Sequence, residues 1–272
     1  MSLFISSINS GSNGNCYYIG NTTDAILVDA GISCRETERR MKRLGLSMAL
    51  VRAIFISHEH IDHISGVPGL SKKYQLPVYI TTSTFGNSNI PIADHLIRGF
   101  DTSQPVEIAG LQVQAFTKSH DAVDPHSFVV SCDHLKVGVF TDIGYSCKEV
   151  TKHFKQCHAV FLESNYCEDM LEQGGYPYFL KQRISGDRGH LSNRQALELF
   201  LRHRGKQLSH LILSHLSKNN NSPDLVDELF RREAGKTQIV VASRYAETAV
   251  FSVGDVLKKN VSHTQQLSLF DV

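Results

Sequence analysis

A cluster of metal-ligand side chains directly after a short apolar segment constrains this chain more than any other feature. Residues 53–57 (AIFIS) predict a buried strand, and the next six residues read HEHIDH. His58 and His60 are two residues apart in an extended chain, so both can point toward one metal ion. The adjacent Asp62 and His63 diverge and suit a second metal ion alongside. The segment therefore predicts a metal centre where a strand ends.

Four other short apolar runs also end in Asp or His, and these residues are the natural partners of the motif. The runs end at Asp29, His120, Asp142 and His215. Imidazole and carboxylate ligands without thiolate favour zinc, manganese or iron. The six cysteines include no C-x-x-C pair, which favours a reduced, cytoplasmic protein.

Many predicted strands with few helices favour two packed sheets with helices on their outer faces over a single parallel sheet. The 272 residues, 41% of them hydrophobic, allow one large domain, which we expect over 1–260, followed by a tail at 261–272. We expect helices near 34–45, 62–74, 147–156, 192–204 and 223–233. We expect strands at 2–8, 16–19, 25–29, 53–57, 78–81, 113–117, 128–131, 137–141, 159–163, 211–214, 239–242 and 249–253.

Charge and hydropathy exclude some classes of partner. The net charge of +1 rules out a protein whose whole surface attracts nucleic acid. No run approaches the roughly 18 apolar residues of a membrane span, so we expect no membrane partner, and no signal peptide is visible. Residues 181–206 nevertheless hold seven basic side chains against two acidic ones. This excess suits a phosphate backbone, although a solvated helix face explains it equally well.

The five motifs, in this order, resemble the metallo-β-lactamase superfamily over residues 1–255. The resemblance implies an α/β fold, an αββα sandwich of two mixed β-sheets flanked by helices, with two divalent metal ions where the sheets meet. A His at position 60 favours hydrolytic zinc over the diiron branch, with manganese as the alternative. The resemblance implies that His58, His60 and His120 hold the first metal and that Asp62, His63 and His215 hold the second. It further implies that Asp142 bridges the two metals and that Asp29 orients ligands.

Two further motifs are similar to the phosphodiesterase branch of the superfamily, which includes the tRNA 3′-processing nucleases. Glu163 ends one strand, and His190 precedes a helix. The resemblance implies that His190 contacts the phosphate or protonates the leaving oxygen, that Glu163 orients it, and that Asp62 takes part in catalysis. The plain alternatives are a salt-bridged strand end for Glu163 and a helix-capping contact for His190. Weaker candidates for substrate contact are Ser12, Asn13, Arg188 and Asn193.

The segments SGSNGNCYYI, SHEHIDHISG, SHDAVDP, FTDIG, LESNY, GHLSN and LSHLSKNNN together resemble the YycJ (WalJ) group of the superfamily. That resemblance implies a 5′ to 3′ DNA exonuclease of replication or repair, in which a metal-bridging hydroxide attacks phosphorus. Tyr166 stands where the group's pattern leads us to expect His. The alternatives are an RNA-end-processing nuclease, a small-molecule phosphodiesterase or thioesterase, and a non-catalytic binding module stabilised by metal.

The last residues before the C-terminus resemble the short peptide with which bacterial DNA polymerases and repair proteins bind the sliding clamp. That segment is Gln266, Leu267, Ser268, Leu269 and Phe270. An extended segment of this kind offers one amide and an apolar anchor to a preformed pocket. The resemblance implies tethering to the DNA polymerase sliding clamp. A terminal strand that packs its apolar side chains onto the body is the alternative.

Overall fold

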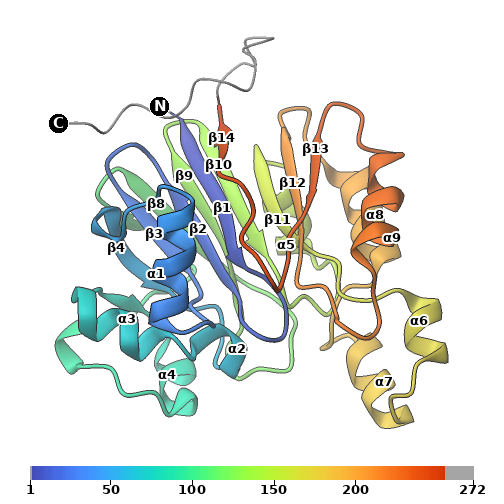
Figure 1. The fold of residues 1–272 in the computed structure, drawn as a ribbon, viewed down its shortest axis with the longest axis horizontal. Coiled ribbons are helices and arrows are strands. Elements are labelled where there is room, and N and C mark those ends of the chain that lie inside the picture. The colour runs from blue at the N-terminus through green and yellow to red at the C-terminus, as the bar shows by residue number, and fades with distance from the viewer. Residues whose placement is uncertain (1, 255–272) are drawn as a thin grey trace.

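The computed structural model describes residues 2–254, which form two seven-stranded sheets (Figure 1). The first has the order β14 (Phe251–Val253), β1 (Leu3–Asn9), β2 (Cys16–Gly20), β3 (Ala25–Val28), β4 (Val51–Phe55), β5 (Val78–Tyr79), β6 (Ile97–Arg98). The second has the order β13 (Gln238–Val241), β12 (His210–Ser214), β11 (Ala159–Glu163), β10 (Leu135–Phe140), β9 (His126–Cys132), β8 (Leu111–Thr117), β7 (Val106–Ile108).

Both sheets are mixed. In the first sheet, pairing is antiparallel from β14 to β3 and parallel from β3 to β6. In the second, it is parallel from β13 to β10 and antiparallel from β10 to β7. The parallel strands of each sheet bring their carboxyl ends to a common edge, and the loops that leave those ends can build one site.

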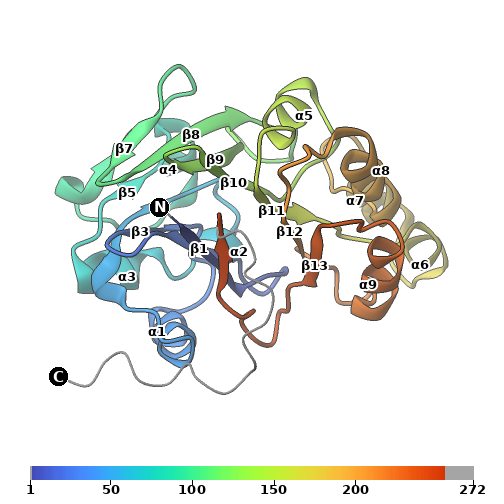
Figure 2. The ribbon, with the colours of Figure 1, turned by 90° about the horizontal axis from the view of Figure 1, so that it is seen from above.

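Helices cover the outer faces of the sandwich, as Figure 2 shows from above. On the first sheet lie α1 (Cys34–Arg43) and α3 (Val67–Tyr74), and on the second α5 (Lys148–Phe154), α8 (Asn193–His203) and α9 (Pro223–Arg231). Four further helices lie toward the lower edge in Figure 1: α2 (Ile61–Ile64), α4 (Thr82–Ser88), α6 (Glu168–Gln173) and α7 (Tyr178–Ser185). Short 3₁₀ turns occupy Met48–Leu50 and Asp94–Leu96. The predicted αββα sandwich is confirmed.

Alternation along the strands divides the apolar side chains between the layers. On β9, Phe128 and Val130 enter the core between the sheets, whereas Val129 packs into the layer beneath α5 and α8. On the outer face of the first sheet, Ile54 and Leu70 belong to a third cluster beneath α1 and α3. Both faces of the sheets are thus buried, which explains why the strands read as short continuous apolar runs.

All twelve predicted strands are present, with ends displaced by no more than two residues, whereas the prediction lacks β6 and β7. The helix predicted over 62–74 is divided into α2 and α3. It breaks at Gly66, where a Cβ atom would lie 1.9 Å from the Ile32 carbonyl oxygen, and α3 then begins at Val67 with Pro68 in its first turn. The prediction also lacks α4, α6 and α7.

None of the helices between residues 2 and 254 combines the length and the apolar character that crossing a membrane requires. The domain boundary predicted at residue 260, the tail 261–272 and the segment Gln266–Phe270 lie outside the described residues.

Candidate metal centre

The metal-ligand candidates converge on one edge of the sandwich, and both sheets contribute to it. In Figure 1 this is the lower edge, where α2 lies. The chain leaving β4 and entering α2 carries four of the candidates, and the ends of β8, β10 and β12 carry the others. The structure thus brings together all seven predicted ligands: His58, His60, Asp62, His63, His120, Asp142 and His215.

The three residues predicted for the first metal form one compact group. One ring nitrogen from each of His58, His60 and His120 lies within 4.8 Å of the other two. His58 Nε2 is 3.1 Å from His60 Nδ1. His58 and His120 are buried, and the His60 side chain is 31% exposed, so this group opens toward solvent on the His60 side.

The residues predicted for the second metal form an adjacent group. One ligand atom from each of Asp62, His63 and His215 lies within 4.8 Å of the others, and both imidazole Nε2 atoms are 3.5 Å from Asp62 Oδ2. Asp142 lies between the groups, with Oδ2 3.2 Å from His63 Nε2 and Oδ1 3.8 Å from His120 Nε2. This placement matches the bridging position predicted for Asp142.

Hydrogen bonds on the outer side of four imidazole rings turn their Nε2 atoms toward the centre of the cluster. Each Nδ1 atom donates to a protein oxygen, which fixes the tautomer that a metal ligand needs. The acceptors are Ser57 Oγ for His58 (2.8 Å), Asp29 Oδ2 for His63 (2.7 Å), the Gly189 carbonyl for His120 (3.0 Å) and Glu163 Oε1 for His215 (3.0 Å). Asp29 therefore lies where the sequence predicts it, behind His63.

The cluster has the chemistry of a divalent-metal site. His120 Nε2, His215 Nε2 and Asp142 Oδ2 are buried and make no hydrogen bond. A buried polar atom in that state costs about 1–3 kcal/mol, which a bound cation would offset. Imidazole nitrogen and carboxylate oxygen are ligands that zinc and manganese accept. The residues present fit a divalent cation.

The two halves of the centre differ in how they bind protons. Burial lowers the pKa of His58 well below its usual value and that of His120 to about 4. Burial alone would also lower the pKa of His63, but the neighbouring carboxylates, above all Asp142, outweigh it and raise that pKa to about 10. For His215, too, Asp142 outweighs burial and raises the pKa well above its usual value. Without metal, His58 and His120 are therefore neutral, whereas His63 and His215 carry protons.

Three residues of the centre have left-handed backbone conformations. Asp29, Asp142 and His215 have φ angles of 57°, 54° and 58°. Non-glycine residues adopt this region rarely, at a cost of order 1–3 kcal/mol each. Local hydrogen bonds hold two of them, since Ser57 N donates to Asp29 Oδ1 (2.8 Å) and His215 N donates to Ser10 Oγ (2.7 Å). Strain therefore accumulates where strand ends present the ligands.

The loop before β2 supplies positioning residues that the sequence analysis missed. Asn15 Nδ2 donates to Asp62 Oδ2 at 3.1 Å and lies 3.1 Å from His63 Nε2, and Asn15 N donates to the Asp62 carbonyl at 2.7 Å. The predicted substrate residues of this loop lie farther out. Ser12 is exposed, and Asn13 Nδ2 donates to the Arg244 carbonyl at 3.0 Å. Asn15 could be identified only from the contact between this loop and Asp62, and the sequence does not show that contact.

Glu163 and His190 lie directly beside the cluster. Glu163 is fully buried, and its Oε2 accepts from Ile143 N (2.7 Å) and Leu191 N (3.1 Å). Its Oε1 accepts from Nδ1 of His190 (2.7 Å) and of His215 (3.0 Å). Burial would raise the pKa of Glu163, but the two histidines outweigh it and lower that pKa to about 2. One carboxylate therefore orients a predicted ligand and a predicted catalytic histidine together.

Asn193 is 2% exposed, and its amide is occupied within the protein. Nδ2 donates to Asn221 Oδ1 (2.9 Å), and Oδ1 accepts from Ser164 Oγ (2.7 Å). This geometry gives Asn193 a structural role between two loops and does not favour the predicted substrate contact. Arg188 is better placed, because Nε donates to the His120 carbonyl (3.3 Å) and the side chain stays beside the cluster.

Tyr166, the departure from the expected pattern, is 4% exposed. It forms a β-bridge with Ser192, and its carbonyl accepts from Asn193 N at 2.8 Å. The aromatic ring thus packs inside the protein, in the loop that follows β11.

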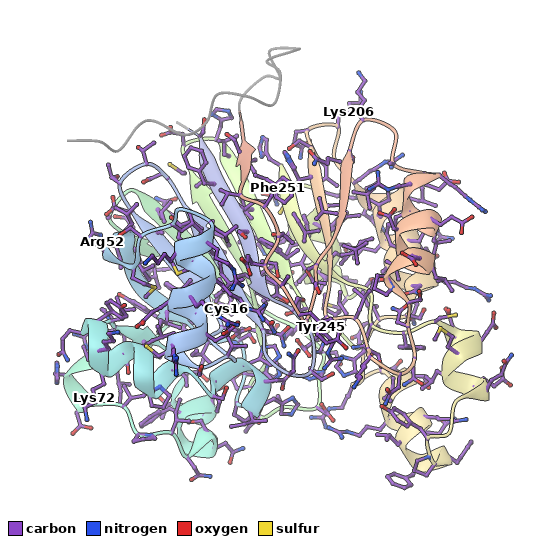
Figure 3. The ribbon with its side chains drawn as sticks, viewed as in Figure 1. Cys16, Arg52, Lys72, Lys206, Tyr245 and Phe251 are labelled. Atoms are coloured by element: carbon purple, nitrogen blue, oxygen red, sulfur yellow. The ribbon has the colours of Figure 1, made fainter. Side chains whose placement is uncertain are left out.

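The basic stretch at 181–206 is divided between two ends of the molecule. Figure 3 places Lys206 at the upper end of the sandwich, whereas α7 lies toward the lower edge (Figure 1). Helix α8 runs between those ends, and Arg202 on it pairs with Glu198 (2.8 Å). Lys181, Arg183 and Arg188 lie on α7 and in the loop that leads from it to His190. The solvated helix face that the sequence offered as the alternative therefore accounts for part of this basic stretch.

The fold and this cluster define a metal-dependent hydrolase, and comparison with known proteins identifies its family. The chain belongs to the β-lactamase superfamily domain family, which matches residues 24–215. It is 35% identical to "Exodeoxyribonuclease YycJ" of Bacillus anthracis (83% of this chain, 86% of that protein) and 32% identical to "Exodeoxyribonuclease WalJ" of Streptococcus pneumoniae (79% and 82%). The predicted membership of the YycJ (WalJ) group is confirmed.

A solved structure also shows the fold. The metallo-β-lactamase fold protein YhfI of Bacillus subtilis superposes with a TM-score of 0.72 at 15% identity, covering 93% of this chain and all of that one.

Proposed function

We propose that this protein is a two-metal phosphodiesterase that degrades DNA as an exonuclease, with 5′ to 3′ polarity, in cytoplasmic replication or repair. One structural observation supports the phosphodiesterase assignment most directly: His190, fixed by buried Glu163, lies at the edge of the ligand cluster, with Nδ1 3.8 Å from Asp142 Oδ1. The names of the relatives support DNA as the substrate.

In this proposal, His58, His60 and His120 would hold one zinc ion, Asp62, His63 and His215 would hold a second, and Asp142 would be a ligand of both. When bound, the ions would supply an activated water and stabilise charge on the phosphate oxygens. Manganese is the alternative metal. Asn15 and Asp29 keep the second-metal ligands in place.

The proposal assigns phosphate contact or protonation of the leaving oxygen to His190. Glu163 is ionised and can only accept hydrogen bonds, so the His190 proton that faces it sits on Nδ1. The opposite ring nitrogen, Nε2, is then the atom that contacts the phosphate or gives a proton to the leaving oxygen. The His190 side chain is 22% exposed, which leaves it accessible to a substrate. Arg188, and more weakly Ser12 and Asn13, are the proposed contacts to the DNA backbone.

Digestion of end-labelled DNA tests the proposal. Purified protein reconstituted with zinc or manganese should shorten 5′-labelled and 3′-labelled strands in the patterns of a 5′ to 3′ exonuclease. Parallel reactions on RNA ends, cyclic nucleotides and thioesters test the alternative substrates on this fold. Efficient turnover of any of those, with intact DNA, would overturn DNA as the substrate.

We further propose that Gln266–Phe270 binds the DNA polymerase sliding clamp. The support is the sequence pattern alone, because the segment lies outside the described residues. Deleting residues 266–270 should abolish clamp binding, measured by surface plasmon resonance, and leave the activity on short oligonucleotides unchanged. Clamp binding by the truncated chain would contradict this assignment.

A further inference from the structure

Helix α7 presents two adjacent aromatic side chains to solvent at its amino-terminal end. Tyr178 is 76% exposed and Phe179 is 73% exposed. Large exposed apolar groups that lie together commonly mark a binding surface. We call Tyr178 and Phe179 the aromatic pair.

The segment that follows the aromatic pair is fastened to the metal centre by several hydrogen bonds. Arg183 Nε donates to Asp121 Oδ2 (2.6 Å), next to ligand His120. Ser119 Oγ donates to the Asp187 carbonyl (2.7 Å), and the Gly189 carbonyl accepts from His120 Nδ1 (3.0 Å). The aromatic pair therefore has a fixed position relative to His120 and His190.

Close backbone packing reinforces this attachment. A Cβ atom on Gly144, two residues after Asp142, would lie 1.9 Å from the Asp187 carbonyl oxygen. The loop after α7 thus rests directly on the loop that carries the proposed bridging ligand. Helix α7 has 8 residues and rises about 1.5 Å per residue, so the aromatic pair lies about 10 Å along the helix axis from its carboxyl-terminal end. At about 3.4 Å per nucleotide of a stacked strand, this length corresponds to about three nucleotides.

The charge of the same segment matches a phosphate backbone. Residues 177–190 contain Lys181, Arg183 and Arg188 but only one acidic residue, Asp187. Arg183 is already paired with Asp121, which leaves Lys181 and Arg188 as the cations for phosphate. Basic groups interleaved with exposed aromatic side chains are the combination that binds single-stranded nucleic acid, because bases stack on the rings while phosphates contact the cations. A paired duplex does not offer its internal base faces to such rings.

We infer that the aromatic pair is a stacking platform for unpaired nucleotides of the DNA strand whose end lies at the metal centre. This inference rests on the proposed DNA substrate. It adds that the enzyme acts on single-stranded ends and on overhangs of about three or more unpaired nucleotides in preference to blunt duplex ends.

The test compares steady-state kinetics of the zinc-loaded full chain and a Tyr178→Ala/Phe179→Ala double variant. The substrates are a single-stranded oligonucleotide, a blunt duplex and a small chromogenic phosphodiester. We expect KM for the single strand to rise about tenfold or more in the double variant. We expect kcat and the activity on the chromogenic substrate to stay unchanged. A Tyr178→Trp/Phe179→Trp variant should keep the wild-type KM, because tryptophan also stacks, and Leu201→Ala on α8 serves as the exposed apolar control.

Several results would overturn the platform. These are an unchanged KM for the single strand, an equal rise for single strand and blunt duplex, or a change of oligomeric state in sedimentation without a change in KM. The last result would assign the aromatic pair to contact between copies of the chain. Failure of the proposed function looks different, because wild-type protein would then cleave the chromogenic diester but no DNA.

Discussion

The carboxylate of Glu163 accepts a hydrogen bond from His190 Nδ1 at 2.7 Å while its second oxygen accepts two backbone N–H groups, from Ile143 and Leu191. Both oxygens of this fully buried side chain therefore act only as acceptors. The orientation of His190 depends on that charge and on both acceptor positions.

Glu163→Gln should impair turnover even though it preserves size and shape. The amide of Gln places an NH₂ group where one carboxylate oxygen accepts hydrogen bonds. That NH₂ group then faces other donors, either the backbone N–H groups or the histidine Nδ1–H groups, and cannot accept from them. We expect kcat to fall about ten- to hundredfold and the pH profile to shift, both measured on labelled DNA. Glu163→Ala should lose at least as much. Wild-type kcat in the Gln variant would show that the charge of Glu163 is not required.

His190→Ala should separate catalysis from metal binding. His190 is outside both ligand groups predicted for the metals, so bound zinc, measured by elemental analysis, should equal the wild-type content. We expect kcat to fall by about 10²–10⁴, the usual contribution of a general acid–base group. Loss of metal in this variant would instead make His190 a ligand, a role that its contact with the Asp142 group makes geometrically accessible.

Asp142→Ala should remove both metal loading and activity. The side chain lies between the two groups, so its loss exposes each cation to repulsion from the other and leaves His63 without its 3.2 Å partner. Elemental analysis should show a sub-stoichiometric metal content, and DNA degradation should be undetectable. The matched control is Asp227→Ala, because Asp227 pairs with Arg231 on the surface of α9. Full activity in Asp142→Ala would refute the assigned bridging role.

Asn15→Ala should weaken metal binding without contacting the metal. Asn15 holds both Asp62 and His63, and loss of such supporting contacts typically costs 10–100-fold in metal affinity. Competition with a chromogenic chelator measures the change. Asn13→Ala is the control, since it removes the same side chain from the same loop but outside the cluster. Equal affinities for the two variants would show that Asn15 does not position the ligands.

Metal binding should release protons from the second group more than from the first. At pH 7 the metal-free His63 is protonated, since its pKa is about 10, and His215, whose pKa is also raised, is protonated as well. His58 and His120, whose pKa values are lowered, are already neutral. Binding of the second ion should therefore release about two protons, and binding of the first ion fewer. Calorimetric titration in buffers of different ionisation enthalpy measures both numbers, and equal release at both sites would contradict this assignment.

The clustering of the predicted ligands could be read from the sequence because they follow apolar runs, and a strand end is visible as a switch from Val, Ile and Phe to Asp or His. The role of Asn15 could not be read, because its partner Asp62 lies 47 residues away and only the folded loop brings them together. Asn193 was a weaker candidate for substrate contact, and the sequence does not show that the folded protein buries its amide against Asn221. The break at Gly66 depends on contact with Ile32, which periodicity within the helix does not encode.

Each predicted ligand group draws two residues from the segment that leaves β4 and enters α2, and one residue that follows a strand of the second sheet, His120 in one group and His215 in the other. Neither sheet holds a complete coordination set, so the reactive centre comes into existence only when the two halves of the chain have docked. A nascent or partly folded molecule would consequently have no hydrolytic activity. A metal ion bound by ligands from both halves would stabilise the folded state, because it binds only when the halves are together.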